Sequence, residues 1–432
     1  MELIKLLGYI FFSILSIIIL LFISILLKVF KIKRKKIIFG TTPILTNKYW
    51  SDALNNIGIE SETLMRRYYS SINKKNDYNK YFDEIIPEIF KKKYLDEIAY
   101  LFFVWLYIIY NAKIFIMPFH GIVFKKYFWK IELILFKLNG IKVIVLPYGS
   151  DAYMYSKIND KSLQHVLLES YPDAARNEKI IENKVFFWSK YTDCTFNAYM
   201  GIDGMPRWDI PLFSFIQIDT NLWNKKKLYS TYNGLDGKVK ILHSPNHRSF
   251  KGTEYLLQAI TDLKNEGLQL ELVLLEKVQN SKVRDLMQDV DLLAEQFIAT
   301  GYALSGIEGM ASGLPVLANL DNKEYTELFR RYSFLNECPI LSTTPETLKD
   351  NLRLLVTNPK LRKELGELGR KYAEKYHSYK MAQHMFTHIF RKLDGEDIDL
   401  MNLYHPLKSE YVKNNYIQTP LVNNRYIHKE EV

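Results

Sequence analysis

Two segments of this 432-residue chain constrain its fold more than any other part of the sequence. Residues 241–260 are ILHSPNHRSFKGTEYLLQAI, and residues 301–320 are GYALSGIEGMASGLPVLANL. Each combines an apolar strand-like run, a loop of small residues and a helical pattern. Parallel α/β folds build sites for phosphorylated ligands from such units, because a helix that begins beside a strand end presents free backbone N–H groups. We therefore expect an α/β fold with a phosphate-binding site in the second half of the chain.

The first half of the chain also alternates strands with helices. Residues 35–43, 114–121 and 142–151 each contain an unbroken apolar run, and residues 50–58 show the apolar spacing of a helix. Unbroken apolar runs are typical of central parallel strands, which are buried on both faces. This pattern predicts a first doubly wound domain over residues 37–235.

A second domain is predicted over residues 236–392, after a turn-rich linker at 232–238. The expected strands are 238–245, 268–276 and 290–295, and the expected helices are 253–267 and 358–376. Such alternation implies a second parallel sheet covered by helices. Residues 393–432 are polar and without a clear period, so we expect a loosely packed C-terminal tail.

The N-terminus predicts a membrane anchor. Between Lys5 and Lys28 lie 22 uncharged residues, which as a helix would extend roughly 33 Å, enough to cross a bilayer core. A cleaved signal peptide is the alternative, but the apolar stretch is too long and no small-residue cleavage site follows it. The basic segment that follows, up to Lys36, predicts a single pass with the rest of the chain in the cytoplasm.

A second span is the less favoured interpretation of residues 100–124. The polar residues Asn111 and Lys113 interrupt this apolar stretch, and His120 and Gly121 close it as a strand end would. We expect a buried helix followed by a core strand instead.

Composition and charge exclude several classes of protein. With 48% hydrophobic and 25% charged residues the chain is globular, and its two cysteines, Cys194 and Cys338, are too few for a disulfide framework. A reducing compartment fits this cysteine content. Residues 1–36 carry +6 of the net charge of +10, which favours contact with anionic membrane lipids over nucleic-acid binding.

Three motifs carry a resemblance to a known family. KGTEYLLQAI, EGMASGLPVLA and the run from Asn358 to Tyr376 resemble the C-terminal half of family 4 glycosyltransferases. The runs ending at His120 and at Asp151 resemble that family's first half, so the likeness covers roughly residues 36–390. The resemblance implies the GT-B fold, in which two Rossmann-like domains face each other, and transfer of a sugar from a nucleotide-sugar donor.

The resemblance implies that Lys251 and Arg248 hold the diphosphate of the donor. Lys251 stands directly before Gly252, as the family's lysine does, whereas Asn246 occupies the usual arginine position and Arg248 follows two residues later. Cationic groups at this loop would stabilise the leaving diphosphate, together with the start of the next helix. The alternative is that both are solvated loop cations.

Glu308 matches the second glutamate of the family's Glu-x7-Glu motif, where it would accept hydrogen bonds from the ribose hydroxyls. We expect it in the first turn of a helix, where an acid favoured by the helix dipole is the alternative interpretation. Thr300 replaces the first glutamate. The backbone of Gly301, Tyr302 and Ala303 is expected to serve the sugar in its place.

The first domain contributes His120 and the loop of Gly149, Ser150 and Asp151. Both segments follow predicted strands, so we expect them at the carboxyl edge of the sheet, facing the cleft. His120 would bond a donor-sugar hydroxyl, and Gly149 would let the backbone approach the ligand. A structural histidine and a helix N-cap aspartate are the alternatives.

The sequence thus predicts a membrane-anchored, retaining glycosyltransferase. Its acceptor would be a lipid-linked sugar or a growing surface polysaccharide, and the nucleotide sugar would be a substrate rather than a cofactor. No metal is expected, because Asp289-Val290-Asp291 and Asp397-Ile398-Asp399 stand outside the position of a glycosyltransferase metal site. A nucleotide-sugar epimerase of the same fold and a non-catalytic binding scaffold are the alternatives.

Overall fold

A computed structural model describes residues 2–30, 32–70, 73–91, 95–124, 127–197, 202–276 and 278–427. The six described strands of the N-terminal domain are all parallel and lie in the order β3-β2-β1-β4-β5-β6. They are β1 Lys36–Thr41, β2 Ser61–Met65, β3 Lys80–Tyr81, β4 Ala112–Met117, β5 Lys142–Val145 and β6 Cys194–Thr195. The chain reverses its direction of winding between β1 and β4, which opens a crevice at the carboxyl ends of these strands.

Helices cover both faces of this sheet. They are α2 Leu45–Asn55, α3 Leu95–Asn111, α4 Ile131–Leu138, α5 Lys161–Ser170, α6 Pro172–Arg176 and α7 Glu178–Tyr191, with short 3-10 turns at Lys75–Asp77, Phe82–Glu84, Glu88–Phe90 and Tyr155–Lys157. The helix α3 leads directly into β4, so the prediction of a buried helix and a core strand at 100–124 is confirmed. Unbroken apolar runs became central strands because both faces of the sheet are covered.

The C-terminal domain contains a second parallel sheet, in the order β11-β10-β9-β7-β8. Its strands are β7 Val239–His243, β8 Leu270–Leu274, β9 Leu292–Gln296, β10 Val316–Ala318 and β11 Leu341–Ser342. The helices are α8 Arg248–Lys251, α9 Thr253–Asn265, α10 Asn280–Leu286, α11 Leu304–Ala311, α12 Lys323–Tyr332, α13 Leu348–Thr357 and α14 Pro359–Tyr376. Winding reverses between β7 and β9, so the loops after these strands form the second crevice.

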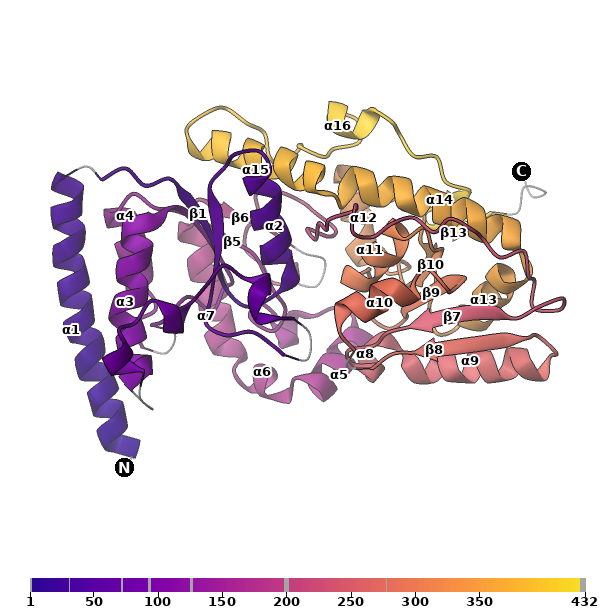
Figure 1. Ribbon diagram of the computed structural model, residues 1–432, viewed down its shortest axis with the longest axis horizontal. Helices are drawn as coiled ribbons and strands as arrows, with labels where there is room; N and C mark the ends of the chain where they lie inside the picture. Colours follow the sequence, from indigo (N-terminus) through magenta and orange to yellow (C-terminus); the bar gives the residue numbers. More distant parts are fainter. Residues whose placement is uncertain are drawn as a thin grey trace.

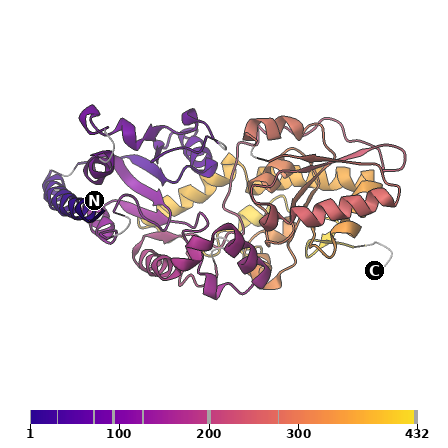
Figure 2. The ribbon, with the colours of Figure 1, turned by 90° about the horizontal axis from the view of Figure 1, so that it is seen from below.

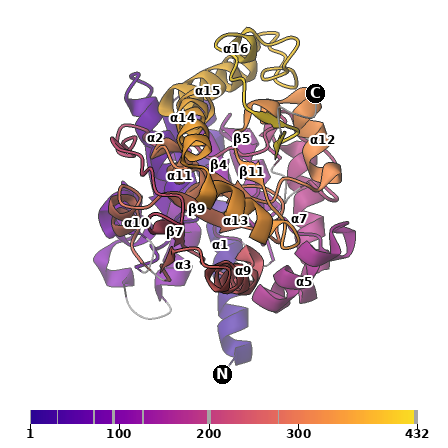
Figure 3. The same ribbon diagram turned by 90° about the vertical axis from the view of Figure 1, so that its right-hand side faces the viewer.

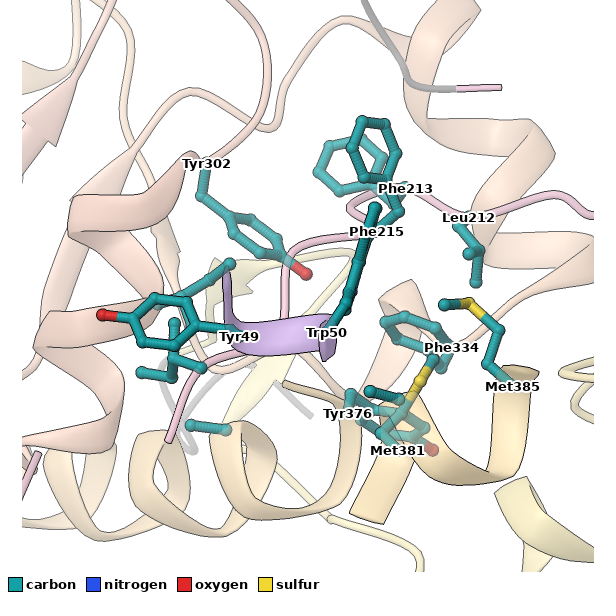
Figure 4. Close-up of a cluster of buried hydrophobic side chains, with 14 of the residues drawn as sticks. Tyr49, Trp50, Leu212, Phe213, Phe215, Tyr302, Phe334, Tyr376, Met381 and Met385 are labelled. Atoms are coloured by element: carbon teal, nitrogen blue, oxygen red, sulfur yellow. The ribbon is translucent and has the colours of Figure 1, made fainter. Parts of the chain in front are cut away.

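The two domains are joined through a shared aromatic core. The helix α15 (Tyr379–Leu393) leaves the C-terminal domain and packs on α2 of the first domain (Figures 1 and 2). Its Phe386 ring lies 5.3 Å from Trp50 and 5.7 Å from Phe39, measured between ring centroids. Phe213 and Phe215 of the connecting segment complete this core (Figure 4). Two Rossmann-like domains with a helix returning to the first one constitute the GT-B architecture.

The expectation of a loosely packed tail is wrong for residues 393–427. Leu400, Tyr404 and Val412 are at most 2% exposed. The hairpin of β12 (Leu421–Val422) and β13 (Arg425–Tyr426) lies beside β11, and α16 (Glu410–Lys413) precedes it. The buried residues follow no regular period, so the sequence pattern did not reveal them.

The N-terminal helix α1 (Glu2–Val29) lies along the outer side of α3 and α4, at the end of the molecule away from the second domain (Figure 1). Seen end-on, its N-terminus projects on the side opposite α14 and α15 (Figure 3). Residues Leu6–Val29 are the one stretch in the described chain that is long and apolar enough to cross a membrane. Lys31 of the basic segment lies outside the described residues.

Candidate active site

A cavity of about 350 Å³ lies between the two domains. Its walls come from the carboxyl ends of both sheets: the loop after β1, the loop after β5, the connecting segment and the loop after β9. The residues that line it include Pro43, Ile44, Tyr148, Gly149, Tyr153, Phe213, Phe215, Tyr302, Ala303 and Leu304. Open α/β sheets bind ligands at such edges, so this cavity is the candidate active site.

Lys251 does not point freely into the cavity. It ends the short helix α8, and Gly252 then reverses the chain with a φ of 73° before α9 begins. The Lys251 ammonium lies 2.6 Å from Glu295 Oε1 and 2.8 Å from Gln296 Oε1, with its side chain 6% exposed. These contacts use two of its three N–H donors, which leaves one for a ligand oxygen.

Glu295 links Lys251 to the loop that lines the cavity. Its Oε1 atom also accepts hydrogen bonds from Ser305 Oγ at 3.0 Å and from Ala303 N at 3.3 Å. Its Oε2 atom is buried and has no hydrogen-bond partner among the described residues. The Lys251–Glu295 pair therefore lies directly behind the cavity wall, with one carboxylate oxygen still able to accept.

Sequence analysis missed Glu295 and Gln296. They end the otherwise apolar strand β9, and polar side chains at the carboxyl end of a buried strand are the signal that could have found them. The Gln296 amide donates to the carbonyls of Ala299 and Gly301 at 3.1 and 2.9 Å. It thereby fixes the segment in which Thr300 replaces the motif glutamate, and the Thr300 hydroxyl is buried without a partner in the described chain.

Glu308 lies in the middle of α11 rather than in its first turn, which corrects the expected position. It is 2% exposed, and Asn280 Nδ2 donates to its Oε1 atom at 2.6 Å. Burial raises the pKa of Glu308 to about 8, an effect that the Asn280 hydrogen bond reduces. The interpretation as a helix-dipole acid therefore fails, because the side chain lies beyond the first turn and inside the protein.

Arg248 lies on the surface, away from the cavity. Its guanidinium donates to Glu254 at 2.8 Å and to Glu276 at 3.2 Å, and these two carboxylates raise its pKa. It faces α5 of the other domain, where it lines a separate hollow with His165 and Glu169. Arg248 and Lys251 therefore do not form one common diphosphate site in this structure.

The structure separates the predicted residues of the first domain. Gly149 lines the cavity with a φ of 135°, whereas Ser150 is exposed and His120 is not among the lining residues. The His120 carbonyl accepts from Lys184 of α7 at 3.0 Å. Only part of this predicted set therefore reaches the cavity.

Asp151 is a loop-bridging residue rather than a helix N-cap. Its two carboxylate oxygens accept from Phe119 N and Tyr148 N, each at 2.9 Å, which ties the loop after β4 to the loop after β5. Burial raises the pKa of Asp151 to about 6, although these backbone hydrogen bonds favour its charged form. Asp151 therefore supports the cavity wall from behind.

Tyr302 is part of the interdomain core and is also among the residues that line the cavity. Its hydroxyl lies 2.9 Å from Tyr372 Oη and 3.1 Å from His377 Nε2. Burial lowers the pKa of His377 to about 4, and its Nδ1 lies 2.7 Å from the Ile216 carbonyl. The loop at 301–303 is thus anchored to the segment that connects the domains (Figure 4).

Comparison with known proteins places these features in context. No family model matches the chain. It is 24% identical over 291 residues to the uncharacterised glycosyltransferase MJ1178 of Methanocaldococcus jannaschii. The alignment covers 60% of this chain and 78% of that protein.

Two solved structures are similar at a greater distance. A glycosyltransferase from Rickettsia africae is 14% identical with a TM-score of 0.48, covering 84% of this chain and 100% of that one. The C-terminal domain of a glycosyl transferase group 1 family protein from Francisella tularensis is 16% identical with a TM-score of 0.27, covering 37% and 98%. The chain has two parallel α/β domains in the GT-B arrangement, and its sequence is similar to that of a protein named as a glycosyltransferase.

Proposed function

We propose that this protein is a glycosyltransferase that moves a sugar from a nucleotide-sugar donor to a membrane-associated acceptor. The observation that carries the proposal is the cavity between the two parallel sheets, where the carboxyl-end loops of both domains meet. A donor held by one domain can there meet an acceptor held by the other, and cleft closure would exclude water. The similarity to a protein named as a glycosyltransferase supports the same reaction class.

The C-terminal domain would bind the donor. The remaining N–H of Lys251 and the N-terminus of α9 suit the diphosphate, and Glu308 suits the ribose hydroxyls. Because Glu295 neutralises Lys251, the site offers the diphosphate less net positive charge than two free cations would. The backbone of Gly301, Tyr302 and Ala303 would contact the sugar, in place of the motif glutamate that Thr300 replaces.

The chemistry we propose is retaining and needs neither a metal nor a cofactor. The acceptor hydroxyl would attack the face of the sugar from which the diphosphate leaves, and a phosphate oxygen would take its proton. This assignment rests on the resemblance to family 4 glycosyltransferases. No protein nucleophile is required, so the residues around the cavity act by binding and electrostatic stabilisation.

The acceptor we propose is a lipid-linked sugar or a surface polysaccharide at the cytoplasmic membrane. The support is the apolar helix α1 and the basic residues that follow it, which would be attracted to the anionic lipids of the cytoplasmic leaflet. An enzyme held at the membrane meets acceptors that are held there too.

Incubation of the full-length protein in native membranes with a series of nucleotide sugars tests this proposal. Transfer predicts release of free nucleotide together with a labelled lipid or polysaccharide product. Interconversion of the sugar would indicate an epimerase, and binding without turnover would indicate a scaffold. The double variant Lys251→Met/Glu295→Gln, which removes both buried charges together, is the matched inactive control.

A further inference from the structure

The helix α1 has two distinct faces. The inner face carries Ser13, Ser16, Leu20 and Ser24, each at most 7% exposed and directed at the N-terminal domain. The outer face carries large apolar side chains, among them Leu7, Phe11, Ile18, Phe22, Ile25 and Val29, which are 54–71% exposed. The small polar residues thus face protein, together with Ile17, Leu20 and Leu27, while the exposed apolar residues face away from it.

The helix is held against the domain along most of its length. Near its C-terminal end, Asn139 Nδ2 donates to Ser24 Oγ at 2.8 Å, and Arg34 donates to the Asn139 carbonyl at 2.7 Å. Near its N-terminal end, the Tyr9 and Tyr127 rings lie 6.5 Å apart. Both ends of α1 therefore lie at the level of the same domain.

This packing is incompatible with a bilayer-spanning position. If α1 crossed the membrane where it is, the helices α3 and α4, against which it packs, would lie at the same depth as the hydrocarbon. Charges are costly there, and Lys130 and Lys137 are exposed on this part of the domain. Only the outer face of α1 can reach lipid while the helix stays packed.

We propose that α1 lies in the plane of the membrane and inserts its outer face into one leaflet, so that the protein is monotopic. Exposed lysines border this face at the C-terminal end of α1: Lys28, Lys33 and Lys35. Their charge complements anionic headgroups, while the apolar side chains match the acyl region below. The occupant of the face is therefore a lipid leaflet rather than the full thickness of a bilayer.

Cysteine labelling in spheroplasts that produce the full chain tests the position of the N-terminus. The native Cys194 and Cys338 are buried, so the background reaction is low. We expect Glu2→Cys to be protected from a membrane-impermeant maleimide in intact spheroplasts and labelled after lysis, as the control Lys35→Cys is. Labelling of Glu2→Cys from outside, with Lys35→Cys protected, would overturn the proposal in favour of a span.

Two further measurements keep the proposal open to refutation. A short bis-maleimide should join the two cysteines of Tyr9→Cys/Tyr127→Cys in native membranes, because a spanning α1 would carry residue 9 to the far side of the bilayer. Absence of this cross-link would contradict the packed position.

Release of the protein by alkaline carbonate would contradict leaflet insertion and indicate a second copy of the chain on this face. The proposal does not depend on glycosyl transfer, since none of these readouts uses activity.

Discussion

Lys251 and Glu295 form a buried ion pair whose structural and functional roles can be separated. Their side chains are 6% and 0% exposed, so removing one partner leaves an uncompensated charge in the interior. We expect Lys251→Ala to lower the free energy of unfolding by about 3–5 kcal/mol. Lys251→Met/Glu295→Gln should recover most of that loss, because it removes both charges and keeps an acceptor for Ser305.

Turnover should not recover with stability. In the proposed function the double variant lacks the cation that would contact the diphosphate, so we expect its transfer activity to be at least about 100-fold lower although the protein is fully folded. Denaturant unfolding and nucleotide release, measured on the same preparations, check both parts. Normal turnover in the stable double variant would show that the pair is structural only.

Glu308 predicts a pH dependence of nucleotide binding. Its pKa of about 8 lies above the ordinary value of 4.5, so the empty site holds it protonated at neutral pH. Ribose hydroxyls that donate to the carboxylate favour its charged form, so binding should release a proton and tighten as pH rises from 6 to 8. Below the pKa of Glu308 in the free protein, the association constant for the nucleotide should rise by at most about tenfold per pH unit. Titration calorimetry in buffers of different ionisation enthalpy measures this proton release.

The same residue predicts a pH dependence of stability in the ligand-free protein. Because the pKa of Glu308 is raised in the folded state, its stabilising contribution is complete below about pH 4.5 and is lost once the pH has passed about 8. Glu308→Gln keeps the shape and the Asn280 contact but cannot ionise. Its melting temperature should fall less than that of the wild type between pH 5 and 8, and parallel curves for the two proteins would contradict the assignment.

Asp151 and Ser150 are neighbours, but we expect alanine substitution to lower the stability of the protein only at Asp151. Asp151→Ala leaves Phe119 N and Tyr148 N without their acceptor, which should cost about 1–3 kcal/mol and loosen the wall of the cavity. Ser150 is exposed, so Ser150→Ala should change the unfolding free energy by no more than about 0.5 kcal/mol. Equal effects in thermal unfolding would contradict the bridging role.

The positions of site residues could be predicted from the sequence where a loop directly follows a strand. Gly149 was expected at the carboxyl edge of its sheet, and it lines the cavity. Tyr302 and Ala303 of the predicted 301–303 segment line it too, while the roles of these residues toward a ligand stay predictions. The direction of a side chain was not predictable. Lys251 turns inward because Glu295 and Gln296, 44 and 45 residues away in the chain, offer it acceptors, and no local pattern records that contact.

At the scale of elements, the central strands were predictable and the tail was not. Buried parallel strands leave an unbroken apolar run, whereas residues 393–427 pack through single apolar side chains and hydrogen bonds at irregular intervals. Lys375, for example, donates to the carbonyls of Val412 and Asn415 at 2.9 and 3.2 Å. Such a segment has no period that a sequence pattern can reveal.

The packed tail predicts that truncation after residue 393 destabilises the C-terminal domain. Removal of Tyr404, Val412 and Ile417 exposes the apolar surface of α14 and α15 that they cover, at a cost of several kcal/mol by burial arithmetic. Removal of residues 428–432 alone is the control. Limited proteolysis should show that the chain truncated after residue 393 is cleaved faster than the control, and an unchanged rate would indicate that the tail contributes nothing to folding.

At the scale of the whole molecule, the two domains are connected on both sides of the cavity. On one side α15 and α2 share the aromatic core, and on the other α5 approaches α8 (Figure 1). At the second connection Tyr171 Oη lies 2.7 Å from His247 Nε2 and Ser249 Oγ donates to Glu169 at 2.8 Å, beside an apolar cluster in which Leu163 and Leu167 of α5 pack with Ala299 and Tyr325. The first connection is the natural hinge, because its shared apolar core is the larger one, and the hydrogen bonds of the second can be exchanged for water.

This asymmetry predicts which side opens. Tyr171→Phe/Ser249→Ala removes these two hydrogen bonds, and at one to two kcal/mol in total it should shift the ratio of closed to open molecules by roughly 5- to 30-fold. We expect small-angle scattering to show a larger radius of gyration for the variant without ligand, and nucleotide sugar to restore the wild-type value. Tyr416→Phe, at a position 55% exposed and remote from the cleft, is the matched control. An unchanged radius in the double variant would mean that the remaining contacts, among them the aromatic core and the Asn322–Asp160 hydrogen bond, fix the two domains, and that substrates enter without the opening of this side.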